Sequence, residues 1–81
     1  MRYSDIKDAC RVCRNVTVLT NANHTERPVG NGWMVRATRF LTYRGDNILY
    51  HLIDPNGISH GGYTSVQRFT QWAVQYIGNE A

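Results

Sequence analysis

The fold is decided by residues 48–62, which read ILYHLIDPNGISHGG. Residues 48–53 are mostly apolar, β-branched or aromatic, a composition that favours a strand. The tetrapeptide Asp54-Pro55-Asn56-Gly57 follows, with proline at the second turn position and glycine at the fourth, which predicts a tight reversal of the chain. We therefore expect 48–53 and 58–62 to be antiparallel strands joined as a hairpin.

Residues 33–43, upstream of this hairpin, alternate between two faces as a long strand does. The more apolar face carries Trp33, Val35, Ala37, Leu41 and Tyr43. Arg39 interrupts that face, so it lies either past the edge of the core or at a β-bulge. Residues 44–47 are expected to turn the chain into 48–53, and the β-branched run 16–20 predicts one more strand.

Two amphipathic stretches flank these strands. Ser4 and Asp5 are suited to begin a helix over residues 4–14. Thr64-Ser65-Val66-Gln67 has the form of a capping box, and an apolar stripe predicts a second helix over 65–77, ended by Gly78. The predicted class is α+β in the order α-β-β-β-β-α: an antiparallel β-meander of three to four strands, flanked by an N-terminal and a C-terminal helix.

Residues 21–32 read NANHTERPVGNG and show neither helical nor strand periodicity. Loops of this length in a small domain are mobile or functional. The chain of 81 residues has room for one domain and one core. We therefore expect a single α+β domain over residues 1–81, with a flexible loop at 21–32.

Charge is unevenly distributed along the chain. The net charge is +3, but residues 1–44 hold eight basic and three acidic side chains, whereas residues 45–81 hold one and three. Eight of the nine cations are arginine, whose planar guanidinium binds phosphate and carboxylate in a bidentate manner. The N-terminal half is therefore the more suited to an acidic partner.

Several classes of protein are excluded or disfavoured by length and hydropathy. A chain this short cannot build a deep, walled active site beside its core, which excludes a large enzyme. No apolar stretch is long enough to span a membrane, and the N-terminus lacks the pattern of a secretion signal. We expect a cytoplasmic protein without a membrane partner, located in the host cytoplasm if a phage encodes it.

Residues capable of catalysis or metal binding are few. Cys10 and Cys13 have Cys-x-x-Cys spacing, but they share the apolar side of the first predicted helix, which favours buried packing over zinc or redox chemistry. His51 and His60 could approach each other across the hairpin, yet no nucleophile or orienting group accompanies them. We therefore predict that the protein is not an enzyme and that it uses no cofactor and no metal.

The entry to the second helix loosely resembles a known nucleic-acid-binding family. Gly62-Tyr63-Thr64-Ser65, followed by Phe69 and Trp72, is similar to the helix entry of the arm-type DNA-binding domain of phage and transposon integrases. The order of elements also resembles that of double-stranded RNA-binding domains. Both resemblances imply nucleic-acid binding, but Arg68 is the only basic residue of this helix, and no family is assigned.

The leading functional hypothesis is a small non-enzymatic protein-binding module. Such a domain resembles in type the accessory proteins with which phages and mobile elements bind and inhibit a host protein. Aromatic and arginine side chains anchor interfaces, and an uncharged glutamine row is easily desolvated. The predicted partner-binding residues are Arg36, Arg39, Arg44, Tyr43, Tyr50, Gln67, Gln71 and Gln75.

Two alternatives remain open from the sequence. The first is nucleic-acid binding through the basic face of the first helix and through arginines at the sheet edge. Its predicted contacts are Lys7, Arg11, Arg14, Arg36 and Arg44. The second is a homodimer formed through an exposed strand edge, which is compatible with either function.

Overall fold

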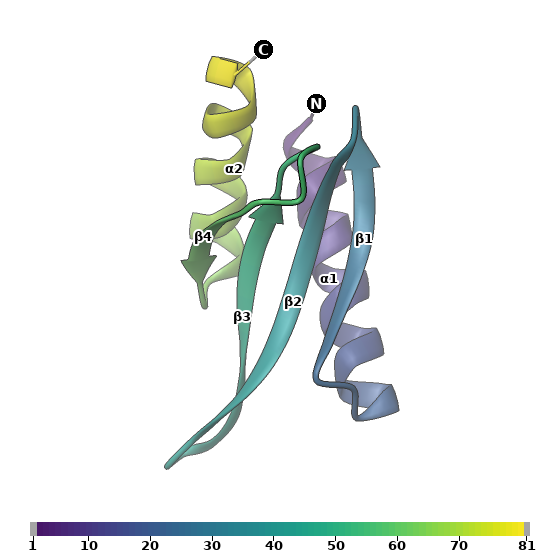
Figure 1. Ribbon diagram of the computed structural model, residues 1–81. Helices are drawn as coiled ribbons and strands as arrows, with labels where there is room; N and C mark the ends of the chain where they lie inside the picture. Colours follow the sequence, from purple (N-terminus) through teal and green to yellow (C-terminus); the bar gives the residue numbers. More distant parts are fainter. Residues whose placement is uncertain (1, 81) are drawn as a thin grey trace.

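The computed structural model describes residues 2–80. It contains α1 (Tyr3–Thr20), β1 (His24–Gly30), β2 (Trp33–Thr42), β3 (Gly45–Ile53), β4 (Ser59–Tyr63) and α2 (Val66–Glu80). The strands form one antiparallel sheet in the order β1-β2-β3-β4. Figure 1 shows both helices on the same side of this sheet, with α1 behind β1 and β2 and α2 beside β3 and β4. The predicted α+β class and the order α-β-β-β-β-α are confirmed.

The core lies between the sheet and the two helices, because alternate strand residues point to that side. The sheet contributes Trp33, Val35, Ala37, Ile48, Tyr50 and Leu52. The helices contribute Ile6, Ala9, Cys10, Cys13, Phe69, Ala73 and Ile77. We call the opposite side the open face of the sheet, since neither helix covers it.

Helix α1 is longer than expected, and the strand predicted over 16–20 is wrong. Thr17 is buried and continues the apolar face of the helix one turn beyond Cys13. Its hydroxyl donates to the Cys13 carbonyl at 2.7 Å, and the Thr20 hydroxyl donates to Val16 at 2.7 Å, so helical geometry satisfies both groups. Tertiary burial therefore overrides the weak strand propensity of a β-branched run. The helix ends at Asn21, which has a left-handed conformation.

The flexible loop predicted over 21–32 is also wrong for most of its length, because residues 24–30 form β1. Pro28 is tolerated since β1 is an edge strand, where one side of the backbone needs no ladder bond. Asn31 and Gly32 both have positive φ, 54° and 84°, as the two central residues of a type I′ hairpin turn require. The Asn31-Gly32 dipeptide is the local sequence signal for this hairpin.

Strands β2 and β3 form the longest hairpin of the sheet, in unbroken register from Met34↔Ile53 to Thr42↔Gly45. The register contains no bulge, so Arg39 lies past the edge of the core. The turn consists of Tyr43 and Arg44, whereas it was predicted at 44–47. Leu41 and Tyr43 were assigned to the apolar face, yet they are 81% and 94% exposed because the hairpin extends beyond the start of α2 (Figure 1).

Smaller differences concern the last two elements. The fourth strand is Ser59–Tyr63, one residue later than predicted, and α2 runs to Glu80 through Gly78, which does not end it. The register of β3 and β4 shifts after Tyr50, where Gly61 and Gly62 have φ of 90° and 122°. A Cβ at Gly61 would lie 2.9 Å from the Trp72 ring, so this glycine allows β4 to approach α2 closely.

We expect Gly61→Ala to destabilise the protein more than Gly45→Ala. Both glycines have a positive φ that costs a residue with a side chain about 1–2 kcal/mol, but a Cβ at Gly45 meets no atom within 4 Å. The methyl group at position 61 adds a clash with Trp72, at a further cost of about 1–3 kcal/mol. Urea unfolding of both variants measures the difference, and equal losses would contradict the tight packing of β4 on α2.

Candidate binding site

The turn between β2 and β3 presents three large side chains to solvent. We call Leu41, Tyr43 and Arg44 the hairpin tip. The Arg44 guanidinium carbon lies 5.6 Å from the centre of the Tyr43 ring, within the range of a cation–π interaction. The turn is internally bonded: the Thr42 hydroxyl donates to the Gly45 carbonyl at 2.7 Å and accepts from the Arg44 N–H at 3.2 Å. The hairpin tip is therefore an apolar and aromatic surface on a turn whose backbone is already ordered.

The exposure of the hairpin tip follows from the lengths of the elements. Leu41 belongs to the sheet face that the helices cover elsewhere, and Tyr43 follows in the turn, but α2 begins level with the middle of the hairpin and runs away from the tip (Figure 1). The molecule is elongated as a result, with extents of 38 × 22 × 20 Å. Neither helix buries these two side chains.

The predicted partner-binding residues do not form one surface. Tyr43 and Arg44 lie at the hairpin tip, and Arg39 lies nearer the core, where its guanidinium donates to the side chain and the carbonyl of Asn21. Arg36 points to the open face and is paired with Glu26, with its Nε at 3.2 Å and its Nη2 at 3.0 Å from Oε1. Gln67, Gln71 and Gln75 are exposed on a different element, α2.

Tyr50 was predicted to bind a partner, and the structure contradicts this. The residue is 2% exposed, and its ring centre lies 5.9 Å from that of Phe69. It is on the helix-covered face of β3, opposite Ala37, so a partner on the surface of the protein cannot reach its ring. The error arose because a tyrosine in a strand that is apolar on both faces carries no signal for burial.

The residues predicted to bind nucleic acid are divided between two sides of the molecule. Lys7, Arg11 and Arg14 are exposed on α1, and Arg11 is paired with Asp8 at 3.2 Å. Arg36 lies on the open face of the sheet, away from both helices. One duplex therefore cannot contact the α1 cations and Arg36 on a single docking face.

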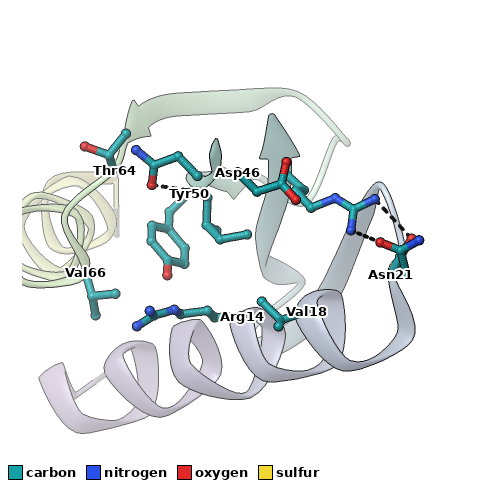
Figure 2. Close-up of a pocket in the computed structure, with 10 residues that line it drawn as sticks. Arg14, Val18, Asn21, Asp46, Tyr50, Thr64 and Val66 are labelled. Carbon is teal, nitrogen blue, oxygen red and sulfur yellow. Dashed lines mark hydrogen bonds between the residues drawn. The ribbon is translucent and has the colours of Figure 1, made fainter. Parts of the chain in front are cut away.

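A pocket of about 590 Å³ lies between the second half of α1, the half of the β2–β3 hairpin nearer its turn and the segment that enters α2 (Figure 2). Its polar lining includes Arg14, Asn21, Asp46, Tyr50 and Thr64. These residues come from elements that are far apart in the sequence, so no local motif could have indicated the pocket. Of the residues predicted to bind a partner, Arg39 and Tyr50 line it.

The two cysteines are buried packing residues, as predicted. Cys10 and Cys13 are both free and at most 2% exposed. Burial raises the pKa of the Cys10 thiol to about 12, and it also raises the pKa of Cys13. Both therefore remain protonated at neutral pH and are poor nucleophiles. Among residues 2–80, no group of three or more histidine, cysteine or acidic side chains could hold a metal ion.

The two histidines of the 48–62 hairpin do not approach each other. His51 pairs with Gly61 and points to the open face, whereas His60 pairs with Leu52 and points toward α2. Nε2 of His60 lies 2.9 Å from Asp54 Oδ2, and its Nδ1 lies 3.2 Å from the Tyr76 hydroxyl. Both ring nitrogens are thus occupied, and the chain of three side chains ties the 54–58 turn to α2.

Comparison with known proteins does not extend this description. No protein-family model, curated protein or solved structure matches the chain. Neither helix of the described residues has the length and apolar character needed to cross a membrane.

Acid should weaken the Asp54 contacts selectively. Hydrogen bonds from His60 and from the Ile58 and Asn56 N–H groups hold the pKa of Asp54 below its ordinary value. A carboxyl with a lowered pKa contributes stability above its unfolded pKa and loses it as the pH falls through the folded pKa. We expect the stability difference between the wild type and Asp54→Asn to shrink as the pH falls below about 4.

Urea unfolding at several pH values between 5 and 3 measures this difference. The variant keeps the size of the side chain and removes its charge. A difference that grows on acidification would contradict the assigned contacts of Asp54.

Proposed function

We propose that the protein is a small non-enzymatic binding module that contacts a partner protein through its hairpin tip. The observation that carries this proposal is the 94% exposure of Tyr43 on an internally bonded turn, beside the 81% exposed Leu41. Single exposed apolar residues are common on protein surfaces. Here a leucine, a tyrosine and an arginine are grouped on one projecting turn.

The chemistry of the hairpin tip suits protein recognition. Tyrosine and arginine are enriched among the residues that dominate binding energy, particularly where they enter a pocket of the partner. An ordered turn also loses little conformational freedom on binding, which favours affinity. The complementary surface is a cleft that accepts the Tyr43 ring and places a carboxylate or carbonyl within reach of Arg44.

The partner we propose is a host-cell protein, bound and inhibited in the cytoplasm by a phage or mobile-element accessory protein. This part rests on the small size of the domain and its resemblance in type to such accessory proteins. The partner is to be identified by capturing it with the tagged protein.

A pull-down from bacterial lysate tests the proposal. The tagged chain, a Leu41→Ala/Tyr43→Ala variant and an Ile58→Ala control are compared with nuclease present and absent, and bound proteins are identified by mass spectrometry. Ile58 is a matched control because it is an apolar residue, 57% exposed, at a different turn. We expect the wild type and the control to retain one partner near equal stoichiometry after nuclease treatment.

The variant should bind that purified partner about 30-fold more weakly or worse, corresponding to the loss of about 2 kcal/mol at a dominant contact. Its unfolding free energy should change by no more than about 0.5 kcal/mol, since neither side chain is buried. Equal binding by wild type and variant would disprove the role of the hairpin tip. Loss of every protein partner on nuclease treatment would favour nucleic-acid binding through Lys7, Arg11 and Arg14.

A further inference from the structure

The pocket beside α1 contains a buried hydroxyl group that has no protein partner. Tyr50 is 2% exposed, and its hydroxyl makes no hydrogen bond with any residue in the described range 2–80. Every side-chain oxygen or nitrogen of these residues that is sealed from solvent has a hydrogen-bond partner. The Tyr50 hydroxyl has none, so it is not sealed and reaches solvent through the pocket that Tyr50 lines. Buried tyrosine hydroxyls usually have a hydrogen-bond partner, so a ligand group that enters this pocket would supply the partner that the Tyr50 hydroxyl lacks.

Arg14 lies across the pocket from this hydroxyl. Figure 2 shows the Tyr50 hydroxyl directed toward the Arg14 side chain. Burial raises the pKa of Tyr50, and the nearby Arg14 charge acts in the opposite direction. Within residues 2–80, Arg14 forms neither an ion pair nor a hydrogen bond. Its guanidinium is therefore available to an anion that occupies the pocket.

The start of α2 adds a further attraction for negative charge at this end. Thr64 and Val66 line the pocket beside Tyr50 and Arg14 (Figure 2). The N-terminus of a helix carries a partial positive charge and N–H groups without intrahelical partners. Ser65 accepts a hydrogen bond from the Arg68 N–H at 3.3 Å, and its carbonyl accepts from Phe69 at 2.9 Å, so this end of α2 is well ordered.

The other end of the pocket has different chemistry. Asp46 and Asn21 lie there, and Arg39 is already bonded to Asn21 (Figure 2). The Asp46 carboxylate repels a ligand that is anionic throughout, but it accepts hydrogen bonds from hydroxyl or amino groups. A ligand that fits both ends has one anionic group and an uncharged body that carries donors.

We propose that this pocket binds a small phosphate monoester, with its phosphate between Arg14 and the Tyr50 hydroxyl and its hydroxyl-bearing body toward Asp46. The volume of about 590 Å³ lies within the range of sites for small organic ligands. Nucleoside monophosphates and sugar phosphates share this chemistry. Asp46 at one end of the pocket pairs with Leu41 of the hairpin tip, whereas Arg14 and Tyr50 lie outside the tip, and binding between them does not depend on a protein partner.

Isothermal titration calorimetry with defined probes tests the proposal. The probes are adenosine monophosphate, ribose 5-phosphate, adenosine and inorganic phosphate. We expect at least one of the two monoesters to bind with 1:1 stoichiometry, and adenosine and inorganic phosphate to bind at least about tenfold more weakly. The monoester that binds more tightly shows whether the uncharged part of the ligand is a nucleoside or a sugar.

Three variants locate the binding. Arg14→Gln and Tyr50→Phe should each weaken monoester binding at least about fivefold, whereas Lys7→Gln, two turns away on α1, should change it less than about twofold. Tyr50→Phe keeps the ring that packs on Phe69, so its fold is preserved, and amide NMR spectra check this for each variant.

Three results would overturn the proposal. They are no binding of either monoester at about millimolar concentration, equal binding of adenosine or inorganic phosphate, and unchanged monoester binding by Arg14→Gln. None of these results bears on the hairpin tip, because Arg14 and Tyr50 lie outside it. Failure of the pocket and failure of the proposed function are therefore distinguishable.

Discussion

The burial of Tyr50 between the sheet and α2 is the interaction on which the rest of the structure depends. Its ring packs on Phe69, and its backbone pairs with Ala37 on one side and Tyr63 on the other. One residue thereby joins three strands to the C-terminal helix. Its hydroxyl emerges in the pocket beside Arg14, near the residues that enter α2.

The position at which α2 begins on the sheet explains the two surfaces proposed for binding. Toward the chain termini, the helices cover the inner face of the sheet and bury its apolar side chains. Beyond Ile48, which is still buried, the hairpin continues without α2, and Leu41 and Tyr43 remain exposed. An apolar group that stays in water lowers the free energy of a complex when a partner covers it. Neither helix covers the hairpin tip, so its apolar side chains are accessible to a partner.

The sequence predicts this fold in outline because its strongest signals are local. The turn at 54–57 and the apolar stripe of α2 each depend on residues close together in the chain. The errors at 16–20 and 24–30 have a tertiary cause: Thr17 and Thr25 share a hydrogen bond of 2.6 Å across α1 and β1, which no local propensity can indicate. Tyr43 and Arg44 were chosen as candidate contacts from residue type alone, whereas the burial of Tyr50 and the pocket depend on how the helices pack on the sheet.

Chemical-shift mapping of the ¹⁵N-labelled chain, with the captured partner added in steps, tests the central claim most directly. Our account predicts that the largest changes occur at the amides of residues 41–45, with small changes on α2 at Gln67, Gln71 and Gln75. The largest changes on α2, or on the α1 face that carries Lys7 and Arg11, would contradict it.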